Sequence, residues 1–221
     1  MKATSDNKLI DIGEVIQNGV VFDFKNWRGG TVDADHIPEA VTRLFALLDK
    51  RGISFVLVGG IALLQYAKGR NTQVIDFIMD QDALEKVSEW EVTGRDEYFA
   101  RTRFEGLRVD LLLTTHPLFA RVKEAYSALR PFHNLHIPCA TVEGLLLLKL
   151  FALPSLYRRG SLDKVALYES DALMLLSRLT GSVDLLHAEL KPHLSDSDFG
   201  EVRKIVEGLY ERIKQIERGR K

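Results

Sequence analysis

The sequence predicts an α+β fold in which a small mixed, twisted sheet flanked by helices is followed by an all-helical C-terminal region. Short apolar segments typical of buried strands occur up to residue 113, and from residue 141 onward the apolar residues recur at helical spacing. Hydrophobic residues make up 46% of the 221 residues, which is enough to bury a core. We divide the chain into an N-terminal arm, 1–36, a core, 37–140, and a helical region, 141–221.

The core is predicted to alternate short helices and strands. Apolar residues recur every three or four positions over 37–48, and Gly52 stands where a C-terminal cap belongs, so we expect a helix there. A buried strand over 53–58 then ends at Gly59-Gly60. The other expected elements are a strand in the arm over 19–24, a helix over 61–67, a strand over 74–79, a helix over 82–90, two antiparallel strands within 97–113 that turn at Glu105-Gly106, and a helix over 117–126.

Four helices are predicted in the helical region. The first begins at Thr141, a residue type that caps helix N-termini, and runs to Leu153. Two more are expected over 162–179 and 183–190. In the last helix the apolar residues of the segment 202–216 form one stripe at helical spacing, which predicts an amphipathic helix packed on the others.

The composition excludes several classes of protein. Thirty basic and thirty-one acidic residues give a net charge of −1, so any contact with nucleic acid needs a local basic patch. The chain has neither the apolar stretch of an export signal nor the ~18 apolar residues of a membrane-spanning helix. Its single cysteine, Cys139, cannot form an internal disulfide. We therefore expect a soluble, cytoplasmic protein with no membrane partner.

The first chemical signal is the pair Gly59-Gly60, which ends a predicted strand and opens a predicted helix. Glycines at such a turn let the phosphates of a ligand approach the backbone, and the free N–H groups of a helix start favour anions. The same pair also occurs as a purely structural turn in many folds, so it does not define a site by itself.

Two acidic residues lie inside apolar strands. Asp76 interrupts Val-Ile-Asp-Phe-Ile-Met, and Asp110 interrupts Arg-Val-Asp-Leu-Leu-Leu. A carboxylate in such a strand is costly unless it is paired or bound to a metal, so we expect the two side chains to meet. Hard oxygen ligands beside a phosphate-binding turn predict a Mg²⁺–nucleotide site. The alternative is that each aspartate forms a local cap or pair.

Together these residues resemble the nucleotidyltransferases of the DNA polymerase β-like superfamily, in particular the small bacterial members grouped with AbiEii-type abortive-infection toxins. The family pattern is a Gly-Gly turn, a short helix, Arg-x-Thr, a strand with Asp-x-Asp, and a third Asp on a neighbouring strand. The resemblance covers residues 37–180, including a later helix that carries a lysine. The matching residues are Gly59, Gly60, Arg70, Thr72, Asp76, Asp110 and Lys149.

The resemblance implies a nucleotidyltransferase-type fold that transfers a nucleoside monophosphate from an NTP to a hydroxyl acceptor, with Mg²⁺ or Mn²⁺. Asp76 and Asp110 would be catalytic metal ligands. The acceptor is a tRNA end, a protein side chain or a small molecule, and analogy with the toxins adds an antitoxin partner. The implied nucleotide-binding residues are Gly59, Gly60, Arg70, Thr72 and Lys149.

One position departs from the family pattern: the first residue of the Asp-x-Asp pair is Val74. Residues i and i+2 of a strand face the same side about 6.6 Å apart, which lets two carboxylates hold the same ions. Valine supplies no ligand, and Asp80 lies ~13 Å from Asp76 along the strand, too far to replace it. Asp82 is expected beyond the strand end. The alternative function is therefore a non-catalytic nucleotide-binding or partner-binding module on the same fold.

Each of the remaining candidate binding residues also has a purely structural explanation. Lys149 could instead be a core-helix lysine that extends its amino group to water. A basic cluster, Arg158, Arg159 and Lys164, fits a phosphate contact or a solvated loop. Zinc binding by the segment 133–139, which holds His133, His136 and Cys139, is disfavoured because a fourth ligand and the usual spacing are missing.

Overall fold

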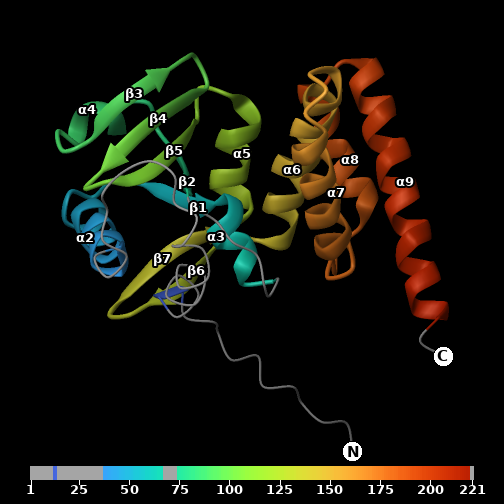
Figure 1. Ribbon diagram of the computed structural model, residues 1–221, viewed down its shortest axis with the longest axis horizontal. Coiled ribbons are helices and arrows are strands. Elements are labelled where there is room, and N and C mark those ends of the chain that lie inside the picture. Colours follow the sequence, from blue (N-terminus) through green and yellow to red (C-terminus); the bar gives the residue numbers. More distant parts are fainter. Residues whose placement is uncertain (1–11, 14–36, 67–73, 220–221) are drawn as a thin grey trace, which may run out of the picture.

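The computed structural model describes residues 12–13, 37–66 and 74–219. It contains a seven-stranded mixed sheet with helices on both sides, and the helices that follow residue 141 stand together beside it (Figure 1). None of the helices in this described part is long and apolar enough to cross a membrane. The strand expected over 19–24 lies outside the described residues.

The strands of the sheet follow the order β3-β4-β5-β2-β1-β7-β6. Strand β2 runs parallel to β5, and β1 runs parallel to β7, whereas the other neighbouring strands are antiparallel. The strands are β1 Phe55–Val58, β2 Val74–Met79, β3 Glu91–Arg95, β4 Phe99–Phe104, β5 Leu107–Leu113, β6 Ser127–Phe132 and β7 Leu135–Ala140.

The helices divide into those that cover the sheet and those that form the C-terminal group. Thr141 caps the first helix of that group, since its hydroxyl accepts a hydrogen bond from the Gly144 N–H at 3.3 Å. The helices are α2 Ile37–Lys50, α3 Gly59–Leu64, α4 Ala83–Lys86 and α5 Pro117–Ala125 in the core, and α6 Val142–Arg158, α7 Leu162–Leu176, α8 Val183–Leu190, the 3₁₀ turn η3 Lys191–His193 and α9 Asp196–Arg218 thereafter.

The two faces of the sheet have different roles. On one face, which we call the closed face, Phe45 of α2 lies 5.7 Å from the Phe55 ring and 5.8 Å from the Phe77 ring. Residues of β4 and β5 alternate strictly between buried and less buried positions, so the closed face is core and the other, open face is partly exposed. Asp76 and Asp110 lie on the open face.

Several predicted elements are confirmed. The helix expected over 37–48 runs to Lys50, and the strand over 74–79 and the helix over 183–190 lie where the sequence places them. The turn at Glu105-Gly106 is also as expected, because both residues have positive φ, 48° and 82°, as a two-residue hairpin loop requires. The change from strands to helices falls between β7 and α6, although a domain boundary at residue 140 stays a prediction.

One predicted helix was wrong in its end, and one hairpin was missed. The helix expected over 82–90 ends at Lys86, and β3 follows it from Glu91. Buried Leu84, Val87 and Trp90 are spaced three residues apart like a helical stripe, but they anchor a turn and the approach to β3. The hairpin of β6 and β7 was not predicted because each strand contains a proline. The edge position of β6 tolerates Pro131, since an edge strand leaves some N–H positions unused.

His116 stands where the core and the C-terminal helices meet. Its Nδ1 accepts a hydrogen bond from the Leu118 N–H at 3.2 Å and so caps α5. Its ring lies 5.0 Å from the Phe151 ring of α6 and 6.0 Å from the ring of His193. Nearby, Arg121 of α5 and Glu189 of α8 form an ion pair at 2.7 Å, which further ties the two parts together.

We predict that acidification weakens this junction. Burial, and then the charge of neighbouring His193, lower the pKa of His116, and burial lowers the pKa of His193. The unfolded chain therefore binds protons first, so stability is lost as pH falls through about 6.5 toward the lower folded pKa values. The melting temperature should fall between pH 7.5 and 5.5, and less steeply in His116→Asn, which keeps a capping acceptor but does not titrate. Identical pH slopes for the two proteins would refute this.

Candidate functional site

Three strands bring the predicted acidic residues together. Val58 of β1 pairs with Asp76 of β2, and Asp76 in turn pairs with Asp110 of parallel β5. Paired residues on neighbouring strands lie about 4.8 Å apart and point to the same face. Both aspartates are half-buried on the open face. The structure thus places side by side the two carboxylates that the sequence analysis expected to meet.

Gly59 follows β1 directly and lies against Asp76. Its φ of +65° is in the left-handed region, and a Cβ atom there would lie 1.9 Å from Oδ2 of Asp76. Only glycine fits this position without moving the carboxylate. Gly60 is buried in the first turn of α3, which begins at Gly59, two residues earlier than predicted. The bare backbone at residue 59 therefore makes room for Asp76, and a phosphate contact at either glycine stays a prediction.

Val74 occupies the first position of β2, on the same face as Asp76 and half-buried. Its neighbour in register on β5 is Arg108. Among the described residues, no three His, Cys, Asp or Glu side chains gather into a metal-binding group. Among the described residues near Val74, the carboxylates available to hold a cation are therefore those of Asp76 and Asp110.

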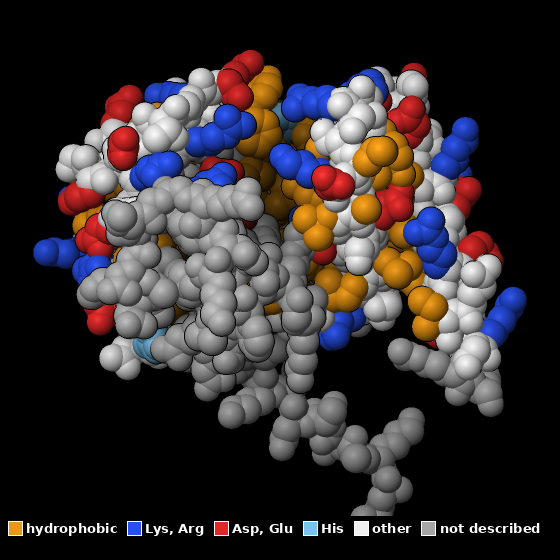
Figure 2. All heavy atoms as spheres, viewed as in Figure 1, with side chains coloured by type: hydrophobic (Ala, Val, Ile, Leu, Met, Phe, Trp, Pro, Cys, Tyr) orange, Lys and Arg blue, Asp and Glu red, His pale blue; other side chains and the backbone are white. Residues whose placement is uncertain are grey.

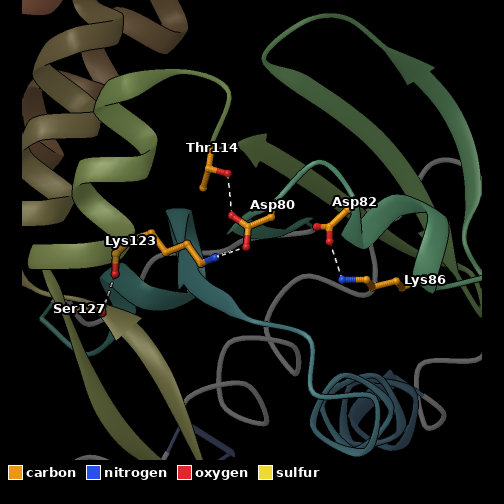
Figure 3. A network of polar contacts seen from close by, with 6 residues as sticks. All are labelled: Asp80, Asp82, Lys86, Thr114, Lys123 and Ser127. Carbon is orange, nitrogen blue, oxygen red and sulfur yellow. Dashed lines mark hydrogen bonds and ion pairs between the residues drawn. The ribbon is translucent and has the colours of Figure 1, made fainter.

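Asp80 and Asp82 do not join them. Asp80 follows the end of β2 and accepts hydrogen bonds from the Thr114 hydroxyl at 2.7 Å and from Lys123 Nζ at 2.6 Å (Figure 3). Burial raises the pKa of Asp80, but the hydrogen bonds from Lys123 and Thr114 outweigh it and hold the pKa below its usual value. Asp82 pairs with Lys86 at 2.5 Å. Asp80 therefore fastens the end of β2 to α5.

Lys149 lies in the helical part of the chain with its amino group engaged. It is 6% exposed, its Nζ is 3.0 Å from Oδ2 of Asp171, and it lies 3.7 Å from the centre of the Tyr168 ring. This pair connects α6 to α7. The expected contact of Lys149 with a phosphate stays a prediction, and the expected sites Arg70 and Thr72 lie outside the described residues.

The other candidates are dispersed. Arg158 forms an ion pair with Asp198 of α9, whereas Arg159 and Lys164 are exposed near the end of α6. His133 has a φ of +49° at the turn of the β6–β7 hairpin, and Cys139 is buried in β7, where burial raises the pKa of its thiol to about 12.

Neither a protein-family model nor a curated protein matches this chain. Among solved structures, ANT(2″)-Ia in complex with adenylyl-2″-tobramycin matches with a TM-score of 0.50 and 11% identity, over 70% of this chain and 97% of that chain. An antigenic nucleotidyltransferase-like protein from Paracoccidioides brasiliensis matches with a TM-score of 0.47 and 16% identity, over 79% and 94%. The likeness to ANT(2″)-Ia shows the fold, which is the nucleotidyltransferase type that the sequence predicted.

Replacing Gly59 should disturb both folding and the site. Gly59→Ala and Gly52→Ala both put a side chain on a residue with left-handed φ, which costs ~1–2 kcal/mol of unfolding free energy. Only Gly59→Ala also collides with Asp76, since no atom lies within 4 Å of a Cβ at Gly52. We expect urea unfolding to show a further loss of ~1–3 kcal/mol for Gly59→Ala. Equal losses in the two variants would contradict this account of Asp76.

Proposed function

We propose that this chain binds a nucleoside triphosphate and a divalent cation at Gly59, Asp76 and Asp110. We further propose that it transfers the nucleoside monophosphate to a hydroxyl acceptor at a rate reduced by Val74. The observation that carries the proposal is the in-register pairing of Asp76 with Asp110, next to Gly59, whose missing Cβ leaves space for the Asp76 carboxylate. The nucleotidyltransferase-type fold supports it.

The two carboxylates fit Mg²⁺ or Mn²⁺. They supply hard oxygen ligands, and two like charges held side by side and half-buried favour a bound cation. When bound, such a cation offsets the charge of the phosphates and lowers the pKa of an acceptor hydroxyl. Asp76 and Asp110 would hold it, and their strands fix both side chains on one face of the sheet.

The proposed reaction balances as a simple displacement. The acceptor oxygen forms a bond to the α-phosphorus, the bond from that phosphorus to the bridging oxygen breaks, and pyrophosphate leaves. The hydroxyl proton passes to solvent. With two carboxylates where the family pattern has three, the chain can position the nucleotide but stabilises the departing charge less well.

The second candidate is a module that binds a nucleotide or a partner without catalysis. Val74 favours it, because a valine at the first position of β2 cannot donate a ligand to a cation. We also propose, separately and from the resemblance alone, that the chain belongs to the AbiEii-like group and has an antitoxin partner.

Restoring the acid at residue 74 tests catalysis directly. Arg108 lies in register with residue 74, so Val74→Asp gains a basic neighbour and should fold. We expect it to transfer label from α-labelled NTPs at least tenfold faster than the natural chain. The acceptors offered are total tRNA, a protein mixture and tobramycin, the last because ANT(2″)-Ia is seen with adenylyl-2″-tobramycin. Val74→Asn controls for shape without charge.

Each result of that assay decides between the candidates. Labelling by Val74→Asp alone shows an enzyme scaffold disabled at one position. Equal labelling by the natural chain shows that the residue 74 acid is dispensable. If neither protein labels any acceptor while both bind nucleotide, the non-catalytic module is the better description.

Cation dependence of nucleotide binding is a second, independent test. With a fluorescent NTP analogue, the natural chain should bind at least tenfold more tightly in Mg²⁺ or Mn²⁺ than in EDTA. Asp76→Asn and Asp110→Asn should each remove most of that difference, because each deletes one ligand charge. Asp82→Asn, an exposed acid outside the site, is the control. Binding that ignores both EDTA and Asp76→Asn would exclude the proposed cation site.

A further inference from the structure

The open face carries a row of arginines beside the two acids. Arg101 of β4 lies in register with Asp110, and Arg103 of β4 lies in register with Arg108 of β5. Paired residues lie about 4.8 Å apart, and Arg101 and Arg103 are about 6.6 Å apart along one strand. We call Arg101, Arg103 and Arg108 the arginine row. Arg101 extends the line of paired residues formed by Asp76 and Asp110, and Arg108 and Arg103 extend the neighbouring line that begins at Val74.

The arginine row is exposed and lacks polar side-chain partners among the described residues. All three side chains are exposed, and within the described part none of their guanidinium groups makes an ion pair or a hydrogen bond. On this face Glu91 of β3 lies in register with Arg103, as Asp110 does with Arg101, but no ion pair forms between them. Six other arginines of the described residues have carboxylate partners: Arg43, Arg51, Arg121, Arg158, Arg203 and Arg212.

An aromatic side chain completes the surface. Phe99 precedes Arg101 by two residues on β4, lies in register with Leu112, and is 44% exposed. Its ring packs on Phe119 of α5 with ring centres 5.4 Å apart, so this contact holds a ring that stays partly exposed. Figure 2 shows Lys and Arg side chains over the part that holds β4 and β5, beside a hollow that separates it from α6 and α7.

We infer that this surface binds a single-stranded nucleic acid, whose phosphates contact the arginine row and one of whose bases stacks on Phe99. Proteins that bind single strands combine a basic track with exposed aromatic rings, and arginine favours phosphate because its guanidinium forms paired hydrogen bonds. An acidic peptide would satisfy the arginines but would leave Phe99 without a role. As the acceptor of the transfer, which rests on the proposed function, the strand would bring its terminal hydroxyl to Asp110 and Asp76.

The test measures binding of a fluorescent 15-nucleotide RNA, and of the DNA of the same sequence, in EDTA without NTP. We expect Arg103→Ala/Arg108→Ala to weaken binding of the strand at least tenfold. Each lost phosphate contact should reduce the slope of log K against log salt by about 0.7. Phe99→Ala should weaken binding threefold or more with no change in that slope. The matched control is Arg178→Ala/Arg203→Ala, which removes the same charge from exposed residues of the C-terminal helical part. This control variant should bind RNA as tightly as the natural chain.

Four outcomes of the RNA-binding assay would each overturn the inference: no binding by the natural chain, an equal loss in the control, a Phe99→Ala variant that binds normally, or poly-glutamate competing as well as RNA. Mg²⁺–NTP binding of the double variant is measured in parallel. If it falls in step with RNA binding, the arginines serve the triphosphate and the inference is wrong. If the natural chain binds RNA but no NTP, the proposed function fails and the nucleic-acid surface stands. The RNA and DNA arms show which strand is preferred.

Discussion

The carboxylate of Asp76 needs the space that a side chain at residue 59 would fill. A Cβ at Gly59 would lie 1.9 Å from Oδ2 of Asp76, so a glycine with left-handed φ is required where β1 passes into α3. The antiparallel register of β1 with β2, and the parallel register of β2 with β5, then fix where Asp110 stands. The site follows from this one close approach, because it sets the position of the first acid against which the second is paired.

Contacts on both sides of the sheet fix the strands that carry Asp76 and Asp110. Phe45 of α2 packs under β1 and β2 on the closed face, and Asp80, bonded to Lys123, fastens the end of β2 to α5. The Arg121–Glu189 pair and the His116 ring then connect α5 to the C-terminal helices. The buried pair of Lys149 and Asp171 acts within those helices. The half-buried acids thus lie on strands that are packed on the closed face and joined to α5 at the end of β2.

Local patterns predicted much of this arrangement. Apolar runs identified β1, β2 and β5, and one acid in each of two such runs was enough to expect a meeting of Asp76 with Asp110. Tertiary context decided the rest. The three-residue spacing of Leu84, Val87 and Trp90 imitates a helix, and two prolines concealed the β6–β7 hairpin. The arginine row was missed although Arg101 and Arg103 alternate with buried Ala100, Thr102 and Phe104, a period-two signal that identifies one face of a strand.

The retained acids bear on how Val74 should be understood. Two neighbouring carboxylates repel each other, and half-burying them costs more than half-burying neutral groups of the same shape, unless a cation or a proton compensates. Valine at residue 74 removes a ligand without disturbing the contact between Gly59 and Asp76, because it lies two residues earlier on the strand. Under the proposed function, the chain would keep the residues that position a cation and a nucleotide, and would lack one carboxylate that speeds the transfer.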